Sequence, residues 1–237
     1  EVRLRDGERH VDAVGQVGHV DIGLLLDVVE RFARVLTRGR GDRGFVLLGV
    51  GLLWFGWFGF NSGSALTADG KAAVVFLNTL IAGCFGMLGW LVVEQVRDGK
   101  PTTFGAASGV VAGLVAITPS CGFISPLGAL IVGIAAGVIC SFAVAWKFKA
   151  GYDDSLDVVG VYFVGGVIGT FLIGLLAAEI VSGGPEGLFY GGGLGQLGKQ
   201  AVAIPVVALF AFGVSFALAK LIDATLGFRI TPDDETG

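Results

Sequence analysis

The chain has 237 residues, of which 54% are hydrophobic and 15% are charged, and its formal net charge at pH 7 is −4. Soluble domains carry about 25% charged residues, so this composition excludes an ordinary water-soluble protein and predicts a polytopic membrane protein. The acidic balance provides no basic surface for nucleic acid, and we expect no nucleic-acid partner.

The charged residues are concentrated at the N-terminus. Residues 1–43 hold eight arginines, no lysine and both histidines, His10 and His19. Only residues 21–36 show a weak amphipathic pattern, and the segment lacks the order of a signal peptide. We therefore expect residues 1–43 to form a polar, Arg-rich N-terminal segment that precedes the membrane domain.

From Gly44 onward, long apolar runs predict six membrane-spanning helices. Most approach the roughly 20 residues needed to cross a hydrocarbon core about 30 Å thick. The third is short and runs into Thr118-Pro119-Ser120-Cys121-Gly122, a helix break that must be covered by protein or line a cavity. The predicted spans are 44–66, 72–93, 104–118, 126–146, 157–178 and 201–222.

Basic residues alternate along the spans. Nine lie at the ends that face one side of the membrane, whereas only Lys71 and Lys199 lie at the other ends. Cytoplasmic loops carry an excess of Lys and Arg, so we expect the Gly44 side and the C-terminus in the cytoplasm. The nine are Arg38, Arg40, Arg43, Arg97, Lys100, Lys147, Lys149, Lys220 and Arg229.

Glycines four residues apart predict close helix packing. Lipid is as apolar as leucine, so helices associate in membranes where small residues let their backbones approach. This pattern predicts a tight bundle. The glycine sets are Gly59/Gly63, Gly105/Gly109/Gly113, Gly133/Gly137 and Gly165/Gly169.

The remaining chemistry is sparse. Cys84, Cys121 and Cys140 have neither zinc-site nor disulfide-framework spacing, and we expect small buried side chains. The sequence shows no P-loop, metal-ligand cluster or nucleophile–base pair, so we expect no metal, no cofactor and no enzymatic activity.

Three stretches are more specific. Residues 56–64 read GWFGFNSGS, residues 113–122 read GLVAITPSCG, and residues 153–166 read DDSLDVVGVYFVGG. In this order they resemble the ammonium transporter family, the Amt/MEP/Rh group. The chain looks like the last six of the family's eleven helices. The resemblance implies an all-α polytopic membrane protein, the second half of an inverted-repeat bundle plus the final long helix.

The resemblance divides the chain into three parts. It implies a six-span membrane domain at 44–226 and a truncated cytoplasmic tail at 227–237, whereas residues 1–43 have no family match. The implied function is passive, channel- or uniporter-type transport of ammonium or ammonia, by a partial chain that does not conduct alone. The alternatives are an ammonium-sensing or regulatory membrane protein, or a channel for another small neutral solute.

The resemblance also implies partners and a location. These are ammonium or ammonia, the lipid bilayer, further copies in a homotrimer, and a nitrogen regulator of the PII type. The implied location is the inner (plasma) membrane, crossed several times.

Six residues match functional positions of the family. Packing, an aromatic belt or helix capping would also explain several of them, because hydroxyls and acids at helix ends often bind the backbone. The implied roles are vestibule hydroxyl for Ser64, pore gate for Phe60, pore lining for Trp57, Thr118 and Tyr162, and structural support for Asp157.

One matched position departs from the family. Tyr162 occupies the place of a pore histidine, and no histidine follows Gly44. Imidazole titrates near neutral pH, whereas the phenol pKa lies near 10. The substitution therefore predicts a poor proton relay at this position.

Overall fold

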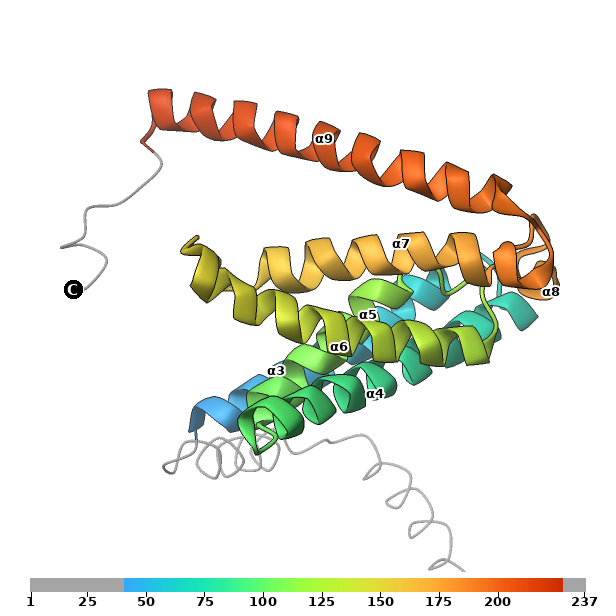
Figure 1. The fold of residues 1–237 in the computed structure, drawn as a ribbon, viewed down its shortest axis with the longest axis horizontal. Helices are drawn as coiled ribbons and strands as arrows, with labels where there is room; N and C mark the ends of the chain where they lie inside the picture. The colour runs from blue at the N-terminus through green and yellow to red at the C-terminus, as the bar shows by residue number, and fades with distance from the viewer. Residues whose placement is uncertain (1–40, 228–237) are drawn as a thin grey trace, which may run out of the picture. The chain divides into compact units, whose positions relative to one another are not determined.

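The computed structural model describes residues 41–227. Of the Arg-rich segment only residues 41–43 are described, and of the tail only residue 227. The amphipathic stretch at 21–36 lies outside the described residues. The chain divides into residues 1–49 and 50–237, and the packing below is that within the second unit. Between residues 41 and 227 every named element is a helix, so the predicted all-α membrane class is confirmed (Figure 1).

Helices occur at all six predicted spans. Five are long and apolar enough to cross a membrane, and the third, with 15 residues, is the shorter one that the sequence predicts. The short helices α8 (Glu179–Ser182) and η2 (Leu188–Tyr190) lie between the last two spans. The six are α3 (Gly41–Gly63), α4 (Gly70–Asp98), α5 (Thr103–Ile117), α6 (Pro126–Ala150), π-helix η1 (Val158–Phe163) with α7 (Val164–Leu176), and α9 (Leu194–Thr225).

Local chemistry sets the helix ends. The side chains of Asp69, Thr102 and Ser125 accept backbone N–H bonds at the starts of α4, α5 and α6, as N-cap residues do. Gly99 and Gly151 end α4 and α6 with φ of 78° and 69°, a conformation that glycine adopts without strain. These boundaries follow from residues visible in the sequence.

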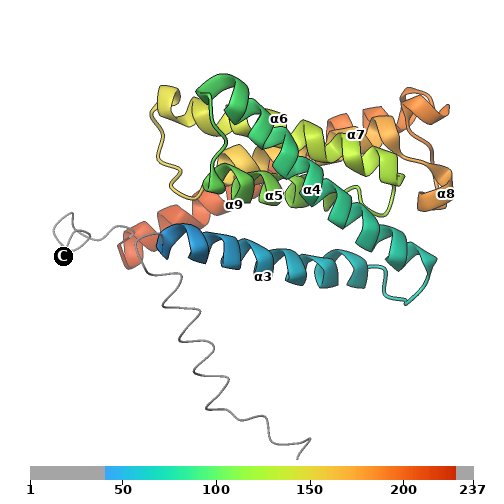
Figure 2. The same cartoon turned by 90° about the horizontal axis from the view of Figure 1, so that it is seen from below.

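Helices α4, α5 and α6 pack side by side (Figures 1 and 2). A Cβ atom on Gly137 of α6 would clash with the carbonyl oxygen of Gly86 in α4. A Cβ atom on Gly109 of α5 would lie 2.7 Å from Trp90 Cβ. The glycine faces of α5 and α6 are therefore contact surfaces, as predicted, and they meet a glycine-rich face of α4 that the four-residue spacing did not reveal.

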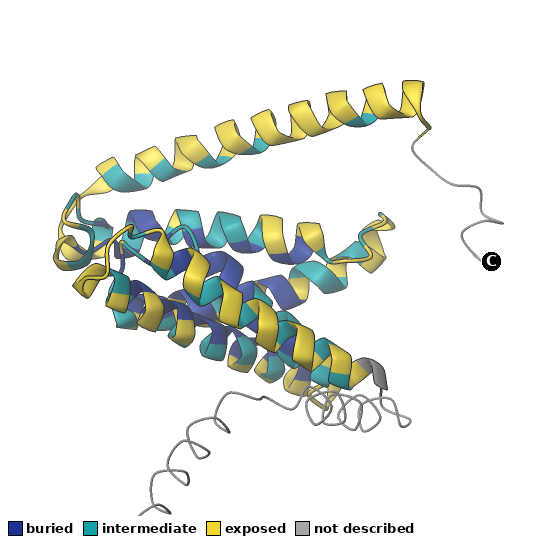
Figure 3. Cartoon of the chain, turned by 180° about the vertical axis from the view of Figure 1, so that it is seen from behind, coloured by how far each residue is buried: buried dark blue, intermediate teal, exposed yellow. Residues whose placement is uncertain are grey.

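The glycine pair in α3 behaves differently. A Cβ atom on Gly59 or Gly63 would meet nothing within 4 Å among the described residues. The predicted close packing at this pair is therefore wrong for the packing described here. Helix α9 contacts α7 and η2, yet none of its residues is buried, and it is almost uniformly exposed in Figure 3.

Two of the three cysteine predictions hold. Cys121 and Cys140 are buried, whereas Cys84 is only half-buried, and all three are free thiols.

Candidate functional site

Trp57 and Phe60 lie on the same side of α3, because residues three positions apart share a helix face, and Ser64 follows directly after the helix ends at Gly63. Phe60 is 69% exposed, Ser64 is also exposed, and Trp57 is half-buried. The Ser64 hydroxyl donates to the Phe60 carbonyl oxygen at 2.8 Å. Ser64 therefore makes the backbone bond expected of a hydroxyl near a helix end, and its vestibule role stays a prediction.

Trp57 and Thr118 come together although 61 positions separate them. The indole Nε1 donates to Thr118 Oγ1 at 2.8 Å, and that hydroxyl donates to the Leu114 carbonyl oxygen at 2.7 Å. The Thr118 hydroxyl has one proton, which it donates to the Leu114 carbonyl oxygen, so toward Trp57 it acts as the acceptor. Thr118 thus serves the helix end and also holds Trp57, joining α3 to the end of α5.

The helix break after α5 uses both of the ways in which a break at membrane depth is tolerated, because Ser120 and Cys121 are buried in protein and Pro119 borders a cavity. Asn78 of α4 is fully buried, and its Nδ2 donates to the carbonyl oxygens of Cys121 and Ile124 at 2.8 and 2.9 Å. This amide supplies the donors that an irregular backbone lacks in lipid. Asn78 was missed from the sequence, although an amide inside an apolar span is itself a signal.

Two further buried polar groups hold helices together. Asn61 Nδ2 of α3 donates to Thr79 Oγ1 of α4 at 3.1 Å. Glu94 of α4 accepts from the backbone N–H of Thr102 at 2.7 Å, from its hydroxyl at 3.0 Å and from Trp90 Nε1 at 3.2 Å. Since each of these groups is engaged by a neighbouring helix or loop, they position the helices.

The two acids Asp154 and Asp157 at the start of η1 have different contacts. The Asp154 carboxylate accepts from the backbone N–H groups of Val158 and Val159 at 2.8 and 2.9 Å, so Asp154 is the capping residue. Asp157 makes no side-chain cap bond and has a φ of 54°. Its carboxylate instead pairs with Lys147 of α6. Helix capping therefore does not account for Asp157, and its supporting role stays a prediction.

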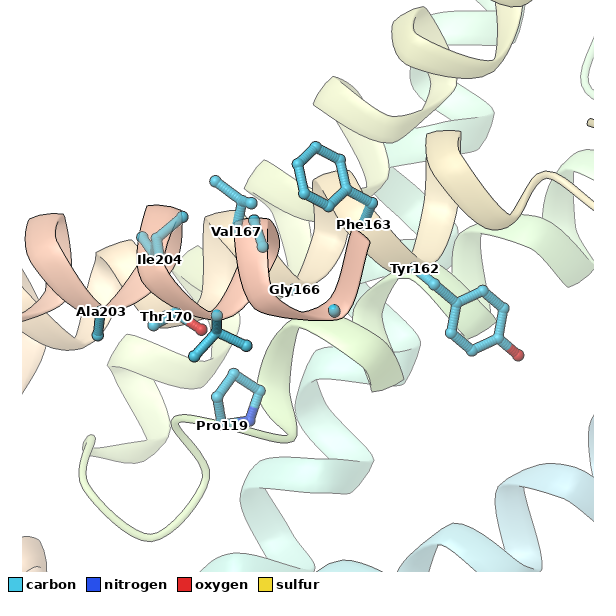
Figure 4. A pocket seen from close by; sticks show the side chains of 11 residues that line it. Pro119, Tyr162, Phe163, Gly166, Val167, Thr170, Ala203 and Ile204 are labelled. Carbon is cyan, nitrogen blue, oxygen red and sulfur yellow. The ribbon is translucent and has the colours of Figure 1, made fainter. Parts of the chain in front are cut away.

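Tyr162 lies in η1 and is 44% exposed. Figure 4 shows its phenol ring pointing away from Pro119 and Ile204. Tyr162 nevertheless borders a cavity of about 430 Å³ between α7 and α9, whose lining is mainly apolar and includes the hydroxyl-bearing Thr170. The lining residues are Pro119, Tyr162, Phe163, Gly166, Val167, Thr170, Ala203, Ile204, Val207, Ala208 and Ala211.

The site thus consists of aromatic faces and isolated hydroxyls. The structure joins Trp57 to Thr118, leaves Phe60 in the last turn of α3 and Ser64 just after it exposed, and carries Tyr162 on the separate element η1. Within residues 41–227 no three His, Cys, Asp or Glu side chains are grouped so that they could hold a metal.

Comparisons with known proteins agree on one family. The model of the Ammonium Transporter Family matches residues 37–237. The ammonium transporter of Mycobacterium tuberculosis (strain H37Rv) is 55% identical over 198 residues, which cover 81% of this chain and 42% of that protein.

Solved structures give the same result. The crystal structure of Saccharomyces cerevisiae Mep2 superposes with a TM-score of 0.74 at 35% identity, covering 79% of this chain and 43% of that one. A structure described as a sensor Amt protein superposes with a TM-score of 0.72 at 30% identity, covering 80% and 46%. The chain spans less than half the length of the curated relatives it matches.

Proposed function

The chain belongs to the ammonium transporter family, and from this premise we propose that it forms part of a passive pathway by which ammonium or ammonia crosses a membrane. The family match over residues 37–237 is the observation that carries the proposal. The exposed Phe60 ring and the Ser64 oxygen next to it support the proposal, because aromatic rings and single oxygen acceptors replace part of the water that a small cation sheds.

In this proposal each site residue has a distinct task. Phe60 closes the entrance, and Ser64 offers a hydroxyl in front of it. Trp57 and Tyr162 line the pathway, while Thr118 holds the indole of Trp57 at 2.8 Å. Asp157 supports η1 through Lys147.

We further propose a multi-pass protein of the inner membrane whose C-terminus is cytoplasmic. Arg97 lies in the last turn of α4, and Lys147 and Lys149 lie in the last turn of α6, which fits the positive-inside rule. A single cysteine introduced at Gly184, in a background without Cys84, Cys121 and Cys140, should react with an impermeant maleimide added outside intact cells. Labelling only after lysis would contradict this orientation.

The pathway needs a second wall in this proposal. In the family two five-helix halves enclose each pore, and three subunits associate, so we propose a homotrimer in which this chain supplies one half of each pore.

Uptake of labelled methylammonium tests transport directly. Cells lacking their own ammonium transporters should show uptake when this chain is produced together with the N-terminal helices of a relative, and background uptake when it is produced alone. Uptake by the chain alone would show that the second wall is not needed. Background uptake from the combination, with both parts in the membrane, would contradict the proposed function.

Tyr162 is expected to limit proton transfer. An imidazole can both accept and release a proton at neutral pH, which makes histidine the common relay residue, so Tyr162→His should raise ammonium current in the combined protein. Currents for ammonium and potassium in both versions check this expectation. Equal or lower ammonium current in Tyr162→His would show that the hydroxyl acts as a pore ligand instead.

Sensing is a second candidate function, and the likeness to the sensor Amt structure favours it. A sensor would bind ammonium and change conformation without net uptake. Ammonium-dependent protection from proteolysis in the combined protein, in the absence of methylammonium uptake, would support this candidate over transport.

A further inference from the structure

Lys147 holds the loop that follows its own helix. It lies in the last turn of α6, yet its side chain is only 12% exposed. Its Nζ donates to the Asp154 carbonyl oxygen at 2.8 Å and pairs with the Asp157 carboxylate, and it lies 5.1 Å from the centre of the Phe148 ring. The charged amino group of the Lys147 side chain therefore binds Asp154 and Asp157, the two ends of the four-residue segment that leads into η1.

The segment held by Lys147 has an uncommon backbone. Asp157 has a φ of 54°, in the left-handed region that residues other than glycine seldom enter. The helix that follows begins as a π-helix, which is rare and occurs mostly as single turns at functional sites. Such conformations persist where surrounding contacts hold them.

The π-helical register decides where Tyr162 points. A π turn contains about one residue more than an α turn, and one residue in an α-helix corresponds to a rotation of about 100°. Relaxation of η1 to an α-helix would therefore turn the Tyr162 side chain away from its present direction. Gly160 of η1 packs closely against Val144 of α6. Helix α6 therefore contacts this turn at two places, through Val144 at Gly160 and through Lys147 at Asp157.

We propose that Lys147 is a positioning residue: through its ion pair with Asp157 it holds the π-helical turn that aims the Tyr162 phenol. That the phenol faces a conduction pathway rests on the proposed function, whereas the ion pair and the turn do not. Lys149 provides the contrast, since it lies two residues further along α6 and borders a different cavity together with Arg97 and Trp146. The two lysines carry the same charge at the same helix end but have different tasks.

Fluorine NMR reports on Tyr162 directly. The chain has three tyrosines, Tyr152, Tyr162 and Tyr190, so 3-fluorotyrosine gives three resonances, and Tyr162→Phe assigns the one of interest. In detergent-solubilised full chain, Lys147→Met should shift or broaden the Tyr162 resonance and leave that of Tyr190 in place. Lys149→Met, the matched control, should change neither. Lys147→Arg, which keeps the charge, should restore much of the original Tyr162 resonance.

Hydrogen exchange measures how strongly Lys147 stabilises the π-helical turn. Backbone amides of residues 158–163 should exchange about tenfold faster in Lys147→Met, which corresponds to ~1.4 kcal/mol, while α4 and α5 keep their protection. Asp157→Asn should accelerate the same amides, because asparagine tolerates a left-handed φ but carries no charge. In the double variant the two effects should not add.

An unchanged Tyr162 resonance and unchanged exchange of residues 158–163 in Lys147→Met would overturn the proposal. If Lys147→Met does not fold, the same two measurements on Asp157→Asn decide, with protection of α4 and α5 as the folding control. Neither readout involves transport. Absence of methylammonium uptake would therefore count against the proposed function alone, and an unmoved Tyr162 resonance would count against the role of Lys147 alone.

Discussion

Helices α6 and α9 are similarly apolar, yet they are packed very differently. Eight residues of α6 are buried, and all but Val132 are Gly, Ala, Cys or Ser, whereas none of the 32 residues of α9 is buried. Large side chains such as Phe210 and Phe212 project from α9 and are about 70% exposed. Within lipid, the small residues and not the hydropathy decide where helices approach closely.

The largest expected effect comes from breaking the small-residue contact. Gly137→Ala places a methyl group against the Gly86 carbonyl oxygen, and overpacking of this kind costs about 1–3 kcal/mol of unfolding free energy. Gly213→Ala in α9 meets nothing within 4 Å and should be neutral or stabilising by ~0.5–1 kcal/mol. Unfolding of both variants in detergent measures the difference. Equal stability would show that α6 and α9 do not differ as described.

A similar but more local effect is expected from the buried amide that supports the helix break. Asn78→Leu leaves the Cys121 and Ile124 carbonyl oxygens without their donor, at a cost of about 2 kcal/mol. The damage should be local, so amide exchange should accelerate in residues 119–125 before it does in α9. Wild-type exchange in that segment would show that the break is supported in another way.

The link between the exposed helix α3 and the packed core gives the third prediction. Thr118→Val keeps the shape of the side chain but removes the hydroxyl that binds Trp57, at a cost of about 1 kcal/mol. The indole N–H resonance of Trp57, assigned with Trp57→Phe, should move and exchange faster with water. Thr118→Ser should preserve it. An unchanged Trp57 resonance in Thr118→Val would show that this hydrogen bond does not connect α3 to the core.

The smallest effect concerns the turn that joins α3 to α4. Hydrogen bonds from the Ala72 N–H and the Thr67 hydroxyl hold the pKa of the Asp69 carboxyl below its ordinary value. A lowered folded-state pKa contributes stability at pH above the ordinary value, and that contribution is lost as the pH falls through the folded pKa. Asp69→Asn should therefore keep the cap but remove a small acid dependence below about pH 4. Superimposable pH–stability curves would contradict this assignment.

The motifs named candidate site residues one by one, but they did not show which of these residues are in contact. The motifs identified Trp57, Phe60, Thr118 and Tyr162, but the bond from Trp57 to Thr118 joins positions 61 residues apart. Asn78 was missed for a related reason, since its two carbonyl acceptors lie more than 40 positions away. Residues that act on distant backbone carry no local pattern beyond being polar in an apolar run.

Some properties follow from the sequence by itself, because they depend on local chemistry summed along the chain. The apolar runs define the membrane helices, and Asp69, Ser125, Gly99 and Gly151 set helix boundaries through side-chain caps and backbone freedom.

Only the tertiary structure decided which of several equivalent residues acts. Gly137 meets a backbone carbonyl and Gly59 does not, Lys147 binds Asp157 and Lys149 borders another surface, and Asp154 caps η1. Spacing along a helix states which residues share a face. It does not state what that face meets, because the neighbour's position depends on the packing of the whole bundle.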